Sequence, residues 1–388
     1  MKRVGVITGT RAEYGLLKPV MDLINRDGDL ELCIIVTGMH LAEQFGYTYK
    51  NIENDGFHIS YKVDMELKDD TSYGLTKSMG IELMKFADVY ENAKLDMVIV
   101  LGDRYEIQIA AIGAMMYCIP IAHIHGGEIT EGLIDEAVRH SVTKMSQIHF
   151  ASTQEYKNRI IQMGEQPHRV YCVGALGTEN IKKLNLLTRE ELCEKYSDIF
   201  KKEYMMITYH PVTLEKDSVE WQFENLLSII SKYKEYNYIF TFANSDTNGL
   251  IINEMIQKYV AENNNSIAYV SMGQIGYLSA LKYCVAVVGN SSSALIEAPS
   301  FNIPTINIGN RQKGRVKAET VIDCGYSTEE IELAFKQAVE QEFKAYCMKC
   351  SNPYEGINTA TTIVREIKNY VYSDDLDIKK KFYDIERL

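Results

Sequence analysis

Candidate acid–base groups follow two apolar, strand-like runs in the first half of the chain. The run 97–101 is followed by the sequence G-D-R-Y-E, and the run 120–124 by H-G-G-E. Because parallel strands deliver the residues that follow them to one edge of a sheet, we expect these side chains to lie together. The candidates are Asp103, His125, Glu128 and Asp135, with Arg139 beside them. A lone carboxylate here could be a helix N-cap and a lone histidine a core residue, but several together favour an acid–base site.

Two further histidines are placed by the same strand logic. Alternation along the run 120–124 predicts that His123 and His125 point to the same side. His210 follows the run 204–208 in the second half of the chain, so we expect it to face the acid–base groups from the opposite wall of a cleft.

Three segments have the character of anion-binding sites. The run 4–8 passes through a glycine-containing turn into a helical pattern, which puts Arg11 at a helix N-terminus, where phosphate binds well. The run 286–289 leads into N-S-S-S and another helical pattern, so hydroxyls and backbone N–H groups gather around Ser291 and Ser292. Residues 307–315 bring cations, among them Arg311. For the Arg11 segment, the alternative is an ordinary turn with a solvated arginine. For the serine segment, the alternative is a well-capped helix.

Glu297 lies about one helical turn beyond the serines, where its carboxylate can accept hydrogen bonds from a ribose diol. A wall that binds phosphate and a wall rich in acids and histidines together indicate an enzyme that acts on a nucleotide sugar.

Composition and missing motifs exclude other classes. The formal net charge of -12 opposes binding to nucleic acid or anionic lipid. No apolar run approaches the roughly 18 residues of a membrane span, and no export signal precedes the first strand-like run, so we expect a cytoplasmic protein. Neither a P-loop nor a G-x-G-x-x-G fingerprint occurs, which disfavours ATPases and nicotinamide enzymes. The eight cysteines are scattered and predicted to be reduced core residues, and the lone C-x-x-C at 347–350 lacks the second ligand pair of a zinc site.

Apolar runs alternate with amphipathic helical patterns along the whole chain, which is typical of parallel α/β sheets. The predicted strands are 4–8, 30–36, 58–63, 97–101, 120–124, 148–151, 170–173, 204–208, 238–242, 267–270, 286–289 and 305–308. The polar stretch 182–202 separates two series of strands. We therefore predict two Rossmann-like, doubly wound domains on either side of a central cleft, residues 1–177 and 178–364, with the C-terminal segment 365–388 returning to the first.

Seven motifs occur in one order that resembles a known family. They are G-T-R-A-E-Y-G, V-T-G-M-H, L-G-D-R-Y-E, H-I-H-G-G-E, R-H-S-V-T-K-M-S, G-N-S-S-S-x-x-x-E and I-N-I-G-N-R-Q-K-G-R. The set resembles the hydrolysing UDP-N-acetylglucosamine 2-epimerases of bacterial sialic-acid biosynthesis, and relatives that act on a UDP-diacetamido sugar for legionaminic acid. The resemblance covers the chain from Val4 to about Tyr383.

The resemblance implies a glycosyltransferase-B-like fold, a UDP-sugar substrate, no metal or other cofactor, and a homodimer or homotetramer. It also implies a two-stage reaction, in which UDP is eliminated to give a 2-acetamidoglycal and water then adds to give N-acetylmannosamine. By matching motifs, the UDP phosphate contacts are Arg11, His210, Ser291, Ser292 and Arg311, with Arg104 added on the phosphate side. Glu297 matches the ribose ligand, Asp103 and Asp135 match carboxylates of the proton transfers, and Arg139 matches their orienting partner.

Two positions separate branches of the family. The branch that includes the animal enzyme has a glutamate where His125 stands, so either His125 or Glu128 takes the place of that acid. Non-hydrolysing relatives have a proline and a lysine where this chain has Ala12 and Leu16, which favours hydrolysis. The alternative functions are the same reaction on the UDP-diacetamido sugar, a glycosyltransferase and a nucleotide-sugar sensor.

Overall fold

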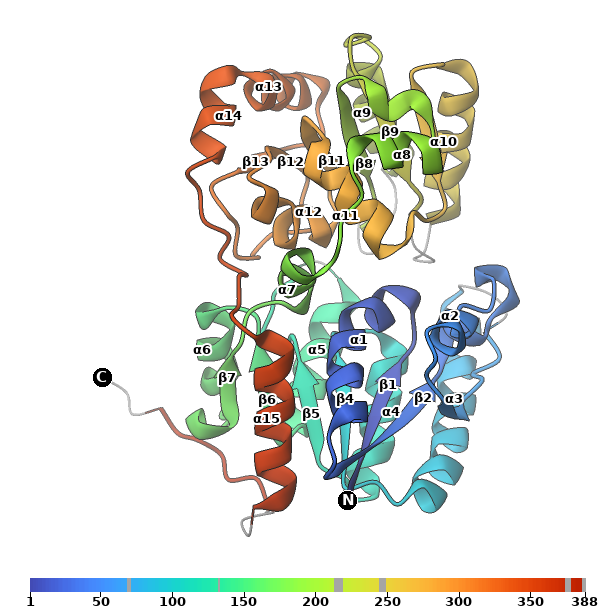
Figure 1. Ribbon diagram of the computed structural model, residues 1–388, viewed down its shortest axis with the longest axis vertical. Coiled ribbons are helices and arrows are strands. Elements are labelled where there is room, and N and C mark those ends of the chain that lie inside the picture. Colours follow the sequence, from blue (N-terminus) through green and yellow to red (C-terminus); the bar gives the residue numbers. More distant parts are fainter. Residues whose placement is uncertain (68–70, 132, 213–218, 244–248, 374–377, 386–388) are drawn as a thin grey trace. The chain divides into compact units, whose positions relative to one another are not determined.

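The computed structural model describes residues 1–67, 71–131, 133–212, 219–243, 249–373 and 378–385. The chain divides into two units, each built on its own sheet (Figure 1). Unit 1 comprises Met1–Glu128, Asp135–Asn180 and Gly356–Leu388, and unit 2 comprises Ile129–Ile134 and Ile181–Glu355. Relative to the predicted domains, the chain returns to unit 1 earlier, at Gly356, and the segment Ile129–Ile134 belongs to unit 2.

Unit 1 contains a parallel sheet with the strand order β3-β2-β1-β4-β5-β6-β7. Its strands are β1 (Lys2–Thr8), β2 (Leu30–Val36), β3 (Ile59–Lys62), β4 (Met97–Leu101), β5 (Ile121–Ile124), β6 (Ile148–Ala151) and β7 (Val170–Cys172). Its helices are α1 (Arg11–Arg26), α2 (Tyr49–Asn54), α3 (Ser72–Ala93), α4 (Tyr105–Met116), α5 (Ile134–Met145), α6 (Gln154–Gln162) and α15 (Thr359–Tyr372), with 3-10 turns η1 (Gly38–Leu41), η2 (Glu43–Phe45) and η3 (Pro167–Arg169). Helix α7 (Leu176–Lys183) leads from unit 1 into unit 2.

Unit 2 repeats the design with the order β10-β9-β8-β11-β12-β13, again parallel. Its strands are β8 (Tyr204–Thr208), β9 (Asn237–Thr241), β10 (Ser266–Tyr269), β11 (Ala286–Gly289), β12 (Thr305–Ile308) and β13 (Val321–Cys324). Its helices are α8 (Arg189–Lys195), α9 (Val219–Ile230), α10 (Gly249–Glu262), α11 (Gly273–Tyr283), α12 (Ser292–Ile296), α13 (Thr328–Val339) and α14 (Gln341–Cys347), with 3-10 turns η4 (Asp198–Lys201) and η5 (Ala298–Phe301).

The α/β prediction is confirmed, and the predicted strands match the observed ones to within two residues at each end. Strand β13 lies outside the predicted set. It is a four-residue edge strand that pairs with β12, and it carries Asp323 in a half-exposed pattern rather than a continuous apolar run. Short edge strands give weak sequence signals because one of their sides stays in water.

Strand order reverses once in each sheet. In unit 1 the chain moves outward from β1 to β3 and then crosses back to place β4 on the other side of β1. In unit 2 the reversal lies between β8 and β11. Loops that leave the carboxyl ends of two such strands diverge, which opens a crevice where ligands of doubly wound folds bind. The candidate groups after β1, β4, β8 and β11 therefore lie at the switch points.

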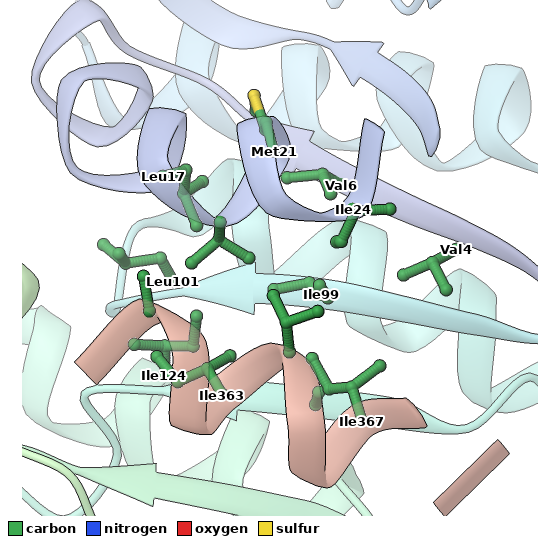
Figure 2. Packing of buried hydrophobic residues seen from close by; sticks show 14 of the residues in the cluster. Val4, Val6, Leu17, Met21, Ile24, Ile99, Leu101, Ile124, Ile363 and Ile367 are labelled. Atoms are coloured by element: carbon green, nitrogen blue, oxygen red, sulfur yellow. The ribbon is translucent and has the colours of Figure 1, made fainter. Parts of the chain in front are cut away.

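One face of the unit 1 sheet is covered by α1 and α15, which pack side by side (Figure 2). Leu17, Met21 and Ile24 recur at helical spacing on α1 and are fully buried against β1 and β4. Each such side chain contributes roughly 1.5–3 kcal/mol of transfer free energy. Thr10 caps α1, since its hydroxyl accepts a hydrogen bond from the Glu13 amide at 3.2 Å. This packing holds the β1–α1 turn in place.

The return of the chain to unit 1 is fixed at the start of α15. Thr359 donates its hydroxyl to the Val173 carbonyl at 2.6 Å, and the Ala360 amide donates to Glu179 Oε2 at 2.7 Å. A Cβ at Gly356 would lie 2.0 Å from that same Val173 oxygen. These contacts explain why unit 1 resumes at Gly356 and not at the predicted residue 365.

Candidate functional site

An ion pair between Asp103 and Arg139 lies at the switch point of unit 1. Asp103 follows β4 after Gly102, whose φ of 79° suits a glycine. Arg139, on α5, donates from Nε to Asp103 Oδ2 at 3.0 Å and also from Nη2 to the same oxygen. The arginine side chain is 1% exposed and the aspartate 23%. The carboxylate is thus partly exposed while its partner is buried.

Arg139 is anchored by the loop after β5 as well as by its own helix α5. Arg139 Nη1 donates to the Glu128 carbonyl at 2.8 Å and to Glu136 Oε2 at 2.9 Å. Burial opposes the guanidinium charge, but the attraction of Asp103 and Glu128 outweighs it and raises the pKa of Arg139. Asp135 is half-buried and lies one helical turn before Arg139, on the same face of α5. Asp103, Asp135 and Arg139 are therefore brought into one neighbourhood.

His125 and Glu128 join this neighbourhood through the loop after β5. His125 has a φ of 66°, and its amide donates to the Phe150 carbonyl at 2.9 Å. Its Nδ1 lies 3.7 Å from Glu128 Oε1, which accepts a hydrogen bond from the Ser152 hydroxyl at 2.8 Å. Both side chains are buried. A non-glycine residue in the left-handed region, held by the surrounding structure, is typical of a functional loop.

The prediction that alternation sets the direction of His125 is wrong, because β5 ends at Ile124 and the left-handed His125 is not part of the strand. His123 is inside the strand and fully buried, with Nε2 2.8 Å from the Gly102 carbonyl and Nδ1 3.1 Å from the Thr143 hydroxyl. Since a carbonyl can only accept, Nε2 carries the proton. Burial lowers the pKa of His123 to about 3, so the ring is neutral and supports the turn that presents Asp103.

Two arginines lie at the other predicted positions of unit 1. Arg11 is the first residue of α1 and is exposed, as a phosphate contact at a helix N-terminus requires. Arg104 is 20% exposed, and its Nε donates to Glu106 Oε1 at 2.7 Å. Arg104 is thus held by a buried carboxylate that the motif contains but the sequence analysis gives no role.

In unit 2, Asn290 connects the candidate residues at the switch point. Its Oδ1 accepts from the His210 amide at 2.7 Å, and its Nδ2 donates to the His210 carbonyl at 2.8 Å. Its own carbonyl accepts from Arg311 Nη1 at 3.1 Å and from Gln312 Nε2 at 2.7 Å. Asn290 is fully buried. One side chain therefore fixes His210, while its backbone holds Arg311.

The serine-rich turn follows directly. Ser291 is the N-cap of α12 and Ser292 its first residue, both are half-buried, and Ser291 makes no side-chain capping bond. The alternative prediction, a helix capped by the Ser291 side chain, is therefore wrong. Glu297 is the C-cap of α12 and is half-buried. Gly289 precedes the turn with a φ of 134°, where a Cβ would lie 1.9 Å from the Thr208 carbonyl oxygen.

Among the described residues, no group of three or more His, Cys, Asp or Glu side chains is arranged to hold a metal ion. In the same part of the chain, no helix has the length and apolar character that crossing a bilayer requires. All eight cysteines are free thiols, but Cys118 and Cys172 are exposed and not in the core.

Comparison with known proteins identifies the family. Residues 22–368 match the family model of the UDP-N-acetylglucosamine 2-epimerases, which is most of the chain. The chain belongs to the UDP-N-acetylglucosamine 2-epimerase family. The resemblance inferred from the seven motifs is thereby confirmed.

Individual relatives agree with this assignment. The chain is 41% identical over 386 residues to the polysialic acid biosynthesis protein P7 of Escherichia coli, covering 99% of this chain and 98% of that protein. It is 40% identical over 344 residues to the hydrolysing GDP/UDP-N,N'-diacetylbacillosamine 2-epimerase of Campylobacter jejuni, covering 88% and 89%. Its fold is similar to the crystal structure of UDP-GlcNAc 2-epimerase from Neisseria meningitidis bound to UDP-GlcNAc, with a TM-score of 0.80, 21% identity, and coverage of 95% and 100%. The fold is thus the predicted glycosyltransferase-B-like one.

This epimerase-family chain contains residues at its site that carry no role in the sequence analysis. Asn290 could be noticed from its place before three serines, but only the tertiary structure shows its bonds to His210. Glu13 and Glu106 stand inside quoted motifs, whereas Glu82 lies in a helical pattern with no local signal that it is buried.

Proposed function

We propose that this protein is a hydrolysing UDP-N-acetylglucosamine 2-epimerase, which converts UDP-N-acetylglucosamine and water into N-acetylmannosamine and UDP. The observation that carries the proposal is the Asp103–Arg139 ion pair, a partly exposed carboxylate held by a buried arginine. Family membership and the anion-binding character of the unit 2 switch point support it.

In the first stage, a base removes the C2 proton while the bond from C1 to the UDP oxygen breaks, giving a 2-acetamidoglycal and UDP. We assign the proton transfers to Asp103 and Asp135, with Arg139 orienting Asp103. His125 and Glu128 are the further acid–base candidates, and the 3.7 Å approach of His125 Nδ1 to Glu128 Oε1 lets them act as a pair. In the second stage, the hydroxyl of water adds to C1 and a proton is delivered to C2 from the other face.

Departure of UDP builds negative charge on the β-phosphate, which cations and N–H donors must stabilise. We assign this role to Arg11, Arg104, His210, Ser291, Ser292 and Arg311, and the ribose diol to Glu297. The proposal assigns no step to a metal ion, and treatment with a chelator should leave turnover unchanged.

Proton NMR of the reaction in heavy water tests the proposal. We expect free N-acetylmannosamine with deuterium at C2 and one UDP per sugar, without any acceptor. Formation of the intact 2-epimeric nucleotide sugar without UDP release would instead mean reversible epimerisation. A need for an acceptor would mean a glycosyltransferase, and binding without turnover a sensor.

A second substrate is favoured by the Campylobacter jejuni relative, whose name gives N,N'-diacetylbacillosamine as the sugar. The same reaction on UDP-2,4-diacetamido-2,4,6-trideoxyglucose is therefore the alternative. Parallel assays with both nucleotide sugars, compared by kcat/KM, decide between them. Turnover of the diacetamido sugar alone would replace the lead substrate.

We further propose that the protein acts in the cytoplasm as a homodimer or homotetramer. Support for assembly comes from large apolar side chains exposed on the adjacent helices α3 and α4, namely Leu83, Met84, Met115 and Met116. A monomeric mass in analytical ultracentrifugation at micromolar concentration would contradict this.

A further inference from the structure

Three buried glutamates meet behind the β1–α1 turn of unit 1. Glu13 comes from α1, Glu82 from α3 and Glu106 from α4, and their residues are 6%, 0% and 0% exposed. Carboxylates are rarely buried unless each has a partner, because removing the charge from water is costly. The proposed reaction gives none of the three a role.

Glu106 is the member that faces a cation. Its Oε1 accepts from Arg104 Nε at 2.7 Å, and it lies in the first turn of α4, where the helix dipole favours a negative charge. A Cβ at Gly9 would lie 2.7 Å from Oε1, and one at Gly38 would lie 3.3 Å from it. Two glycines on neighbouring turns thus leave room for this carboxylate.

Glu82 shares the Thr37 hydroxyl with a backbone carbonyl, an arrangement that favours a neutral acid. Thr37 Oγ1 lies 2.6 Å from Glu82 Oε1 and 2.8 Å from the Val63 carbonyl oxygen. Thr37 has one hydroxyl proton, so it cannot fully serve both acceptors while Glu82 is ionised, whereas with Glu82 protonated both contacts can be hydrogen bonds. Burial also raises the pKa of Glu82 well above its usual value.

Glu13 completes the group on the other side of Gly9. Its Oε2 accepts from the Gly9 amide at 2.7 Å, so the carboxyl groups of Glu13 and Glu106 both contact this residue. Burial, and then the charge of Glu106, raises the pKa of Glu13 to about 8. Glu13 is therefore mainly protonated at neutral pH.

The other titratable groups around the cluster are neutral. His40, on η1, has its pKa lowered to about 4 by burial and lies 3.1 Å from the Thr8 hydroxyl through Nε2. Tyr105, on α4, has its pKa raised by burial and by Glu106. Among the described residues, the charges that act on Glu13 and Glu82 are those of Arg104 and Glu106.

We propose that Glu13, Glu82 and Glu106 form one buried acid network that carries a single negative charge, on Glu106, and that this charge positions Arg104 to bind the diphosphate of UDP. The inference rests on the proposed function for the assignment of Arg104 to the diphosphate. Glu106 is a positioning residue, and the two protonated acids keep a second negative charge away from the phosphate-binding arginine.

Infrared spectroscopy tests the protonation states directly. Wild-type protein with carboxyl-labelled ¹³C glutamate should show isotope-shifted carbonyl bands of protonated glutamate at pH 7. One band should vanish on titration through about pH 8 and be missing in Glu13→Gln, and the other should be missing in Glu82→Gln. Absence of protonated glutamate bands in the wild type at pH 7 would overturn the network, whether or not the variants fold.

UDP binding, measured by calorimetry, tests the positioning. Arg104→Gln and Glu106→Gln should each weaken UDP binding by about tenfold at pH 7, and the double variant should bind no more weakly than Arg104→Gln alone. Additive losses, or wild-type affinity in Arg104→Gln, would overturn the proposal. Between pH 7 and pH 9 the wild type should lose roughly tenfold more affinity than Glu13→Gln, because ionised Glu13 repels the diphosphate.

Glu91→Gln is the matched control, since Glu91 is an exposed glutamate of α3 and should follow the wild type at every pH. Titration of UDP itself changes the affinity of all variants equally, so it cancels when they are compared. If the UDP affinity of Glu13→Gln changed with pH as that of the wild type does, the proposal would also be overturned. Because these experiments measure binding alone, their failure is distinct from failure of the proposed reaction, which wild-type turnover decides.

Discussion

Replacing Asn290 by alanine should damage unit 2 and its affinity for UDP together. The change removes the two side-chain hydrogen bonds to the His210 backbone, of 2.7 and 2.8 Å. Each bond contributes about 1 kcal/mol, and leaving the buried N–H and C=O of His210 without partners adds to the cost, so we expect a loss of about 2–4 kcal/mol. For a unit of this size, that lowers its Tm by roughly 5–15 °C.

The assay is thermal unfolding in parallel with UDP calorimetry well below the lowered Tm. Because the Asn290 carbonyl also holds Arg311 and Gln312, we expect UDP to bind at least about tenfold more weakly. Asn290→Asp keeps the acceptor for the His210 amide but loses the donor to the His210 carbonyl. Its Tm should therefore lie between those of the wild type and Asn290→Ala. Asn264→Ala, at an exposed asparagine in the turn before β10, is the control. If Asn290→Ala unfolded and bound UDP like Asn264→Ala, the reasoning would be refuted.

Three further outcomes follow from the structure. Asp103→Asn and Asp135→Asn should each lower kcat by roughly 100-fold or more with UDP affinity preserved, and wild-type turnover in either variant would remove that residue from the mechanism. Glu297→Ala should mainly weaken UDP binding, which calorimetry measures, and unchanged affinity would contradict the ribose role. Burial alone would raise the pKa of Glu165, but the hydrogen bond to His149 lowers it to about 2. The ionised Glu165 therefore stabilises the fold above about pH 4.5, and this stabilisation is lost as the pH falls towards 2. Glu165→Gln should therefore lower Tm at pH 7 but much less near pH 3, and an equal loss at both pH values would contradict the linkage.

The strands and the residues that follow them could be predicted because they depend on local sequence. Continuous apolar runs such as 97–101 and 204–208 mark strands buried on both faces, and the polar residues after them must lie at the sheet edge. Asp103 and His210 are located in this way. The half-exposed edge strand β13 has no such run, so its pattern could not be separated from a loop.

Side-chain direction could not be predicted where the backbone leaves the strand. The sequence pattern predicts that His125 continues the alternation of β5, but its left-handed conformation ends that alternation and turns the ring towards Glu128. Which strands are neighbours also depends on the whole sheet, since β4 pairs with β1 and not with β3. Only this order places Asp103 and the β1–α1 turn at one switch point.

By itself, the sequence determined the α/β class, the strands, and which acids, histidines and cations follow them, since these depend on patterns within a few residues. The tertiary structure decided which of those groups touch and which are charged. The pairing of Asp103 with Arg139, the hold of Asn290 on His210, and the burial of Glu13 and Glu82 join residues far apart in the chain. Burial and long-range pairing set the protonation states, and neither is encoded in local spacing.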